Sequence, residues 1–310
     1  MSLQFIMGNS GSGKSYCLYD TVVREAIENP DKNYLVIVPE QFTMQTQKDL
    51  CLAHPKGGIM NIDVLSFGRL AYRVFEEVGQ DARVVLDDEG KNLVLRKIAG
   101  ECEKDLKVFK GNLKKQGYIS EVKSVLSEFA QYGVDFERLD DFMKEVPPES
   151  YLHYKLDDIR TIYEKFEEYL SEKYITKEEM LDVLSDAVPY SDILKGSVVA
   201  MDGFTGFTPV QNRLIGELFS VCEKVMITVT MDGRENPYVY EHPYQIFALG
   251  KQMVTSLMKI AGEKKTEIEE PICLFERPVY RFRDCSEMAF LETELFRYSG
   301  AKYNGSCIAA

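Results

Sequence analysis

The sequence predicts an α/β fold with a parallel sheet and a large helical insertion. Short apolar segments alternate with amphipathic segments near both ends of the 310-residue chain, and strands that alternate with helices in this way form a parallel sheet covered on both faces. Between these two parts the apolar residues follow helical periodicity alone. We therefore expect three consecutive parts: residues 1–86 as the first part of the core, 87–195 as the helical insertion and 196–310 as the second part of the core.

In the first part, three apolar segments each precede a helical pattern. The segments LQFIM, YLVIVP and IDVLSF are the expected strands. Helices are predicted over residues 14–27, 41–50 and 68–79, directly after these strands. Pro39 should end the second strand, because proline cannot donate a ladder hydrogen bond.

In the helical insertion, apolar residues recur at intervals of three and four. The two stripes are Val122, Val125, Leu126 and Phe129, and Ile159, Ile162, Tyr163 and Phe166. Stripes of this kind form the core between helices rather than a cofactor site. Helix breaks are expected at Gly117, Gly133 and Pro147-Pro148, and no strand is predicted between residues 87 and 188.

In the third part the alternation resumes. SVVAM and KVMITVTM are predicted strands, whereas VQNRLIGELFS and PYQIFALGKQMVTSLMKIAGE are predicted helices. The sequence closes on GSCIAA, which has the pattern of a strand cut in mid-run. We therefore expect this chain to be a fragment of a longer protein.

Charge and hydropathy restrict the possible partners. The net charge is −13, which argues against a free-standing DNA-binding protein, because phosphate neutralisation needs a positive face. One local cluster of lysines is either a solvated helix face, our preferred interpretation, or a contact to a DNA backbone; it comprises Lys104, Lys107, Lys110, Lys114 and Lys115. The apolar runs are too short to span a bilayer and the first residues do not form a signal peptide, so we expect no membrane association and a cytoplasmic location.

The seven cysteines occur without a CxxC pair, and the chain has only three histidines. A complete zinc or iron–sulfur site needs closer spacing of its ligands. The thiols are therefore expected to be reduced, unless cysteines from outside this chain complete a cluster.

The strongest motif lies directly after the first predicted strand. Residues Gly8-Asn9-Ser10-Gly11-Ser12-Gly13-Lys14-Ser15 fit the phosphate-loop pattern G-x-x-x-x-G-K-[ST]. In such a loop, backbone N–H groups and a helix N-terminus surround the phosphates, the lysine reaches the β and γ phosphates and the final hydroxyl ligates magnesium. The sequence thus predicts an ATP and Mg²⁺ site; the alternative is a Gly/Ser-rich turn with an accidental lysine.

Asp202, at the end of SVVAM, is the expected second magnesium ligand besides Ser15. Nucleotidases of this type place a carboxylate after that aspartate to orient and deprotonate the attacking water. Here the next residue is Gly203, which can do neither. Asp232 and Glu235 on the next predicted loop are possible substitutes, although such residues usually only stabilise a turn, and no catalytic residue is assigned.

Together these segments resemble a known family. GNSGSGKS, VPEQFTMQTQ, VLSFGRLAYRVFEEVG and VVAMDGFTGFTPVQ are similar to the helicase-like N-terminal part of the B subunit of AddAB-type helicase–nucleases. ALGKQMVTSL and YRFRDCSEMAFLETELF support the same resemblance. More distantly, the chain is similar to superfamily 1 helicases of the UvrD and RecB kind. The resemblance implies a role in bacterial double-strand-break repair and homologous recombination.

The resemblance also implies a RecA-like core that binds ATP but does not unwind DNA, since the partner A subunit supplies the motor. Residues 38–47 and 64–79 stand where an active motor contacts single-stranded DNA, so DNA would be reached through the complex. The chain has no GD-x-x-Q-x-I-Y segment, which couples nucleotide to strand in active motors. The nuclease domain and the iron–sulfur cysteines of the full-length family member are not in this sequence.

Two other functions remain open at this point. In the first, the chain is an active phosphate-loop ATPase or a small-molecule kinase, with the helical insertion as a lid and another group in place of the missing carboxylate. In the second, the chain is an interaction module with a vestigial loop. The retained Gly13, Lys14 and Ser15 argue against the second, because packing does not require the lysine.

Overall fold

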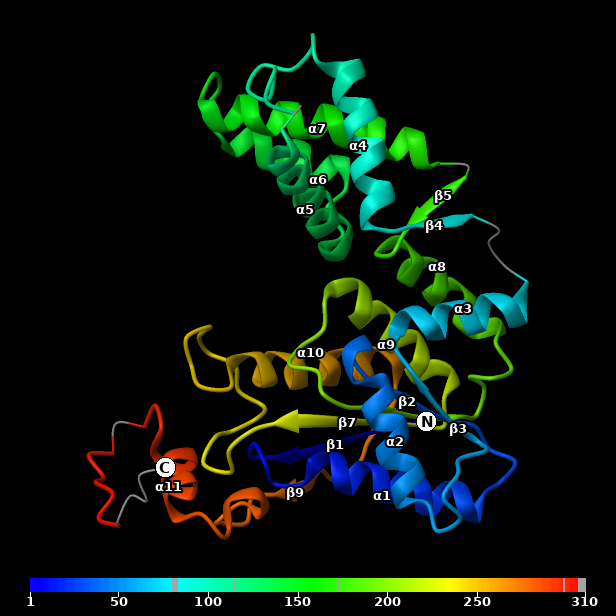
Figure 1. Cartoon of the computed structure of the whole chain (residues 1–310), viewed down its shortest axis with the longest axis vertical. Helices are drawn as coiled ribbons and strands as arrows, with labels where there is room; N and C mark the ends of the chain where they lie inside the picture. The colour runs from blue at the N-terminus through cyan, green and yellow to red at the C-terminus, as the bar shows by residue number, and fades with distance from the viewer. Residues whose placement is uncertain (80–82, 114, 172, 298, 306–310) are drawn as a thin grey trace. The chain divides into compact units, whose positions relative to one another are not determined.

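The computed structural model describes residues 1–79, 83–113, 115–171, 173–297 and 299–305 (Figure 1). The chain divides into two compact units. The first comprises Met1–Leu70, Val188–Phe207 and Ile215–Ala310, and the second comprises Ala71–Ala187 and Thr208–Leu214. Each unit has an apolar core of its own.

The first unit is built on a seven-stranded sheet in the order β3-β2-β6-β7-β1-β8, with β9 also paired to β1. Its strands are β1 (Ser2–Gly8), β2 (Tyr34–Ile37), β3 (Ile62–Leu65), β6 (Val198–Met201), β7 (Lys224–Thr230), β8 (Glu267–Ile268) and β9 (Ile272–Leu274). All of the strand pairs described in this sheet are parallel. The predicted α/β class is therefore confirmed, and the sheet is consistent with a RecA-like core.

Helices cover this sheet, and several follow a strand directly. They are α1 (Lys14–Glu28), α2 (Thr43–Ala53), α10 (Ala248–Lys264) and α11 (Ser286–Glu294), with 3-10 turns η1 (Glu40–Phe42), η2 (Val188–Tyr190) and η3 (Tyr280–Phe282). Leu18 and Val22 of α1 and Leu50 of α2 pack with Ile6 and Val36 of the sheet in one apolar core. The boundary between the units falls within α3 (Phe67–Val78) and α9 (Pro209–Val221).

The predicted strands and helices of this unit are confirmed with small shifts. The largest shift is in α10, which begins at Ala248 and not at Pro243. Phe247, directly before the helix, has a left-handed backbone with φ 65°, and this conformation cannot continue a right-handed helix backwards. The strand expected at the end of the sequence lies outside the described residues from position 306 onward.

The second unit is mainly helical. It contains α4 (Asp88–Cys102), α5 (Gln116–Tyr132), α6 (Phe136–Glu145), α7 (Tyr151–Leu170) and α8 (Glu179–Ala187), with the short strands β4 (Val84–Leu86) and β5 (Tyr174–Thr176). Both predicted stripes pack in its apolar core, which confirms that they are structural. Gly133 ends α5 in the left-handed conformation, with φ 63°, and Pro147-Pro148 separates α6 from α7, as predicted.

Two predictions for this unit were wrong. β5 pairs in parallel with β4, although no strand was expected there, because three residues are too few to show a strand period. Gly117 does not break a helix, since α5 begins at Gln116 and a glycine in the first turn precedes most of the intrahelical hydrogen bonds.

The lysine cluster does not form a helix face, because residues 103–115 lie between α4 and α5 and, where described, form turns and bends. The buried carboxylate of Asp158 holds this segment by accepting hydrogen bonds from the backbone N–H groups of Lys107, Val108 and Phe109 at 2.8, 2.7 and 2.8 Å. Backbone donors that are bound to a side chain are not free to form a helix. Lys114 lies outside the described residues.

Among the described cysteines all six have free thiols, as expected, and Cys307 lies outside the described part. No helix in the described part of the chain is both long and apolar enough to cross a membrane.

Candidate nucleotide-binding site

The phosphate loop joins the end of β1 to the start of α1, so the predicted strand, loop and helix are confirmed. Gly11 and Gly13 have left-handed backbones, with φ 82° and 95°, a conformation that side-chain-bearing residues rarely adopt. At Gly8 a Cβ atom would overlap the Ser12 hydroxyl and lie 2.8 Å from the Leu274 carbonyl oxygen. The glycines are therefore required by the turn itself.

The loop presents donors that suit an anion. Gly13 is the N-cap of α1 and supplies no side-chain cap, so the first N–H groups of this helix are available to phosphate oxygens. Two buried polar atoms of the loop, Asn9 Oδ1 and Ser12 Oγ, lack a partner within the described residues. Ser10 and Ser15 are exposed, which leaves the Ser15 hydroxyl accessible to a metal ion.

Lys14 lies over its own loop. Its Nζ atom donates to the carbonyl oxygens of Gly8 and Asn9 at 3.0 and 2.8 Å. Burial lowers the pKa of the Lys14 ammonium to about 8; the charge of Asp202 opposes this effect, and that of Arg281 adds to it. The lysine is thus both partly desolvated and electrostatically coupled to the predicted metal ligand.

Asp202 follows β6 and is 7% exposed. One carboxylate oxygen accepts a hydrogen bond from the Tyr19 hydroxyl at 2.8 Å, and the other accepts one from the Thr228 hydroxyl at 2.6 Å. These two hydroxyls, rather than that of Ser15, bond the carboxylate within the described residues. The aspartate is therefore oriented by α1 on one side and by β7 on the other.

Gly203 has a left-handed backbone with φ 79°, and a Cβ atom there would meet Pro39 Cδ at 3.5 Å, an ordinary contact. Space is thus available for a side chain, but the backbone conformation strains any residue other than glycine. The position after the aspartate is built as a turn and carries no base.

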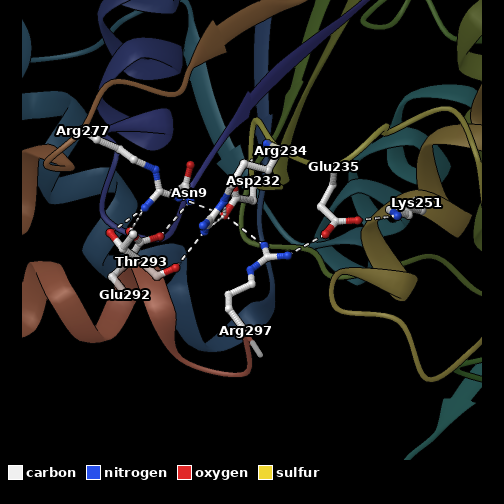
Figure 2. Close-up of polar contacts among 9 residues, drawn as sticks. All are labelled: Asn9, Asp232, Arg234, Glu235, Lys251, Arg277, Glu292, Thr293 and Arg297. Carbon is white, nitrogen blue, oxygen red and sulfur yellow. Dashed lines mark hydrogen bonds and ion pairs between the residues drawn. The ribbon is translucent and has the colours of Figure 1, made fainter. Parts of the chain in front are cut away.

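Asp232 and Glu235 do not replace the missing carboxylate in this geometry. Figure 2 shows Asp232, which is 2% exposed, surrounded by Arg234, Arg277 and Arg297 at 2.7, 2.9 and 2.9 Å. Glu235 pairs with Lys251 at 2.8 Å and with Arg297 at 2.6 Å. Both carboxylates hold neighbouring segments together.

Their electrostatics agree with this structural role. Burial acts to raise the pKa of Asp232, but the Arg234 hydrogen bonds and the Arg277 charge outweigh it and hold this pKa well below the usual range. Hydrogen bonds from Lys251 and Arg297 lower the pKa of Glu235. A general base works best with a pKa near the working pH, and both groups are shifted away from it.

Three residues near the site were not found from the sequence. Tyr19 lies four residues after Ser15, so helical spacing alone could have placed it on the same side of α1. Thr228 lies one residue beyond the partner of Met201 in β7, which only the strand register reveals. Arg281, in η3, donates its backbone N–H to the Gly11 carbonyl at 3.1 Å, and no local pattern predicts that contact.

No group of three or more potential metal-binding side chains occurs in the described part of the chain. A cation held through one hydroxyl, one carboxylate and phosphate oxygens does not need such a group, because magnesium usually takes only one or two protein ligands. Ser15 and Asp202 therefore suit a metal that arrives with a nucleotide.

The parallel sheet, the phosphate loop and the buried strand-end aspartate define a phosphate-loop α/β protein. The model of the family described as "ADDB, N-terminal" matches residues 5–292, and the chain belongs to this family. The resemblance found from the sequence is thereby confirmed.

Similar proteins share one name, which describes the B subunit of an ATP-dependent helicase/deoxyribonuclease. The chain is 44% identical over 302 residues to that of Lachnoclostridium phytofermentans, 34% over 302 residues to that of Clostridium acetobutylicum and 35% over 307 residues to that of Clostridium kluyveri. These matches cover 96%, 96% and 99% of this chain, but only 26%, 25% and 26% of the relatives. The chain thus spans about a quarter of their length.

Proposed function

We propose that this chain is the ATP-binding, helicase-like N-terminal region of a helicase–nuclease B subunit and that it binds nucleotide with little or no hydrolysis. The observation that carries the proposal is the pairing of a complete phosphate loop with an aspartate that is followed by a left-handed glycine. The first feature supports binding, and the second removes the position of the base.

The loop residues have separate roles in this proposal. The N–H groups of residues 8–15 and the start of α1 surround the phosphates. Lys14 exchanges the carbonyl oxygens of Gly8 and Asn9 for phosphate oxygens, while Ser15 and Asp202 hold magnesium, Asp202 directly or through water. Bound Mg²⁺ neutralises phosphate charge.

Low turnover follows from the surroundings of Asp202. Gly203 offers no group that could orient or deprotonate water. Asp232 and Glu235 are bound to arginine and lysine side chains, and their pKa values are lowered. The competing function, an active ATPase or a kinase, needs a free carboxylate that the described residues near the loop do not offer.

The name of the relatives motivates the larger role. As part of such a B subunit, this region would act with an A subunit that supplies the motor, in cytoplasmic double-strand-break repair and recombination. Residues 38–47 and 64–79 would contact single-stranded DNA within that complex. Phe42 is 48% and Met44 73% exposed, so both could stack on or pack against bases.

DNA binding by this chain alone should be weak and sensitive to salt. The net charge of −13 opposes a DNA backbone at long range, so contacts at residues 38–47 would act only where a partner holds the strand. Tight, sequence-independent binding to single-stranded DNA at physiological salt would contradict this part of the proposal.

Calorimetric titration with ATP and Mg²⁺ tests the site. The wild-type chain should bind in a magnesium-dependent manner, and Lys14→Ala should lose binding while retaining its fold by circular dichroism. Lys32→Ala is the matched control, because Lys32 precedes β2 at the opposite end of the parallel strands and pairs only with Glu223 within the described contacts. Equal affinity in the wild type and Lys14→Ala would refute the assignment.

A further inference from the structure

A segment far along the chain lies against the phosphate loop. Residues 277–297, called the arm below, include η3 and α11. The arm touches the loop at Gly11, whose carbonyl oxygen accepts the Arg281 backbone N–H at 3.1 Å. A Cβ atom on Gly11 would lie 2.8 Å from Arg281 Cβ, so the arm and the loop are in close contact.

The arm is anchored by an ion-pair network centred on Asp232 (Figure 2). Arg277 and Arg297, at the two ends of the arm, each donate to Asp232 Oδ2 at 2.9 Å. Arg234 adds a hydrogen bond of 2.8 Å to the Thr293 carbonyl oxygen. Asp232 is buried, so these charged contacts are screened little by solvent.

Glu292 of α11 connects this network to the phosphate loop. One of its carboxylate oxygens accepts a hydrogen bond from Asn9 Nδ2 at 2.7 Å, and the other accepts one from Arg277 at 3.2 Å (Figure 2). Asn9 is 1% exposed and the Glu292 side chain 13% exposed. A carboxylate therefore contacts the second residue of the phosphate motif in a poorly hydrated place.

A bound triphosphate and Glu292 would disfavour each other. Phosphates bring several negative charges to the loop, and like charges in a partly buried site repel more strongly than in water. The Asn9–Glu292 hydrogen bond also fixes the part of the loop whose carbonyl oxygens retain Lys14. Movement of Lys14 toward phosphate is therefore easier once this contact is released.

We propose that the arm is an autoinhibitory latch, in which the Glu292 contact to Asn9 restrains the phosphate loop and opposes nucleotide binding. The proposal rests on the nucleotide-binding function proposed above. Because coupling between two sites is reciprocal, ATP binding must loosen the arm to the same extent that the docked arm weakens ATP binding.

The affinity test uses Glu292→Gln, which removes the charge but keeps an oxygen that can accept from Asn9. Calorimetry should show ATP binding about fivefold tighter than in the wild type, at the lower end of typical couplings. Glu287→Gln is the control: it makes the same charge change on α11, where Glu287 contacts Cys285 and Ser286 of its own turn. An equal gain in both variants would reduce the effect to bulk charge and overturn the latch.

A second test does not depend on nucleotide. Glu292→Ala should speed amide hydrogen exchange in residues 9–13 of the nucleotide-free chain, and Mg²⁺–ATP should speed exchange in α11 of the wild type. Unchanged exchange in both experiments, with normal ATP binding, would overturn the latch alone. If neither the wild type nor Glu292→Gln binds ATP better than Lys14→Ala, the nucleotide site and the latch are both wrong.

Discussion

The Tyr19 hydroxyl donates a 2.8 Å hydrogen bond to the Asp202 carboxylate, which links α1 of the phosphate loop to the strand-end aspartate. Burial, together with the Asp202 charge, raises the pKa of this tyrosine far above its usual range, so Tyr19 remains a donor throughout the physiological range. Thr228 completes the arrangement from β7. The orientation of Asp202 is therefore set before any metal binds.

Tyr19→Phe should destabilise the chain by about 1.5–3 kcal/mol, the usual worth of a hydrogen bond to a charged group. Its removal leaves one oxygen of a buried carboxylate without that donor. Thermal and urea unfolding would measure the loss. Tyr16→Phe, three residues earlier on α1 and 76% exposed, should change little; equal stability of both variants would show that the Tyr19 bond has no energetic role.

Gly203→Ala should cost about 1–2 kcal/mol, because φ 79° is a left-handed conformation. Gly206→Ala is the matched control, since Gly206 is not among the positive-φ glycines and no heavy atom lies within 4 Å of its added Cβ. Comparable unfolding midpoints for the two variants would contradict the strain argument.

Gly203→Glu should not by itself produce a helicase. The substitution adds a carboxylate but strains the backbone, and the sequence has no GD-x-x-Q-x-I-Y segment to couple nucleotide to strand. A strand-displacement assay on duplex DNA with a single-stranded tail would detect any unwinding. DNA-stimulated unwinding by this variant would mean that the coupling machinery has been misjudged.

ATP binding should weaken as pH rises above about 8. The pKa of Lys14 is about 8 in the nucleotide-free chain, so the ammonium is largely charged at pH 7 and largely neutral at pH 9. Phosphate favours the charged form and raises this pKa; binding near pH 8.5 should therefore take up part of a proton, and less at pH 7. Titrations in buffers of different ionisation enthalpy measure this uptake, which should vanish in Lys14→Met.

Asp158→Ala should destabilise the helical unit by about 3 kcal/mol or more, because three backbone N–H groups lose a charged acceptor. Asp157→Ala, the adjacent control, breaks only an exposed pair with Lys107 and should cost under about 1 kcal/mol. Similar losses in the two variants would refute the role of Asp158 as the anchor of residues 107–109.

The strands, the phosphate loop and most helices could be predicted because each depends on neighbouring residues. Periodicity placed β1, α1 and β6, and the glycine-lysine pattern located the loop between the first two. Short elements escaped, as β5 shows, because three residues carry no period. The lysine cluster was misread as a helix face because Asp158, some 50 positions away, determines the shape of that segment.

The contacts that determine the chemistry of the site could not be predicted in the same way. Asp232 and Glu235 carry no mark in the sequence that they are bound to arginines from the arm. Asn9 and Glu292 are separated by 283 positions, and only the folded sheet brings them together. Identity and spacing predict which groups could act, whereas long-range partners decide which of them are free to act.

The most direct test of the central claim follows ATP binding and ATP hydrolysis in one sample of the purified chain, with Mg²⁺, in the presence and absence of single-stranded DNA. We predict saturable, magnesium-dependent binding with turnover far below about 1 per second, the low end of ordinary enzymes, and no stimulation by DNA. Rapid, DNA-stimulated hydrolysis that is lost in Lys14→Ala would contradict this account and show that another group replaces the carboxylate missing at Gly203.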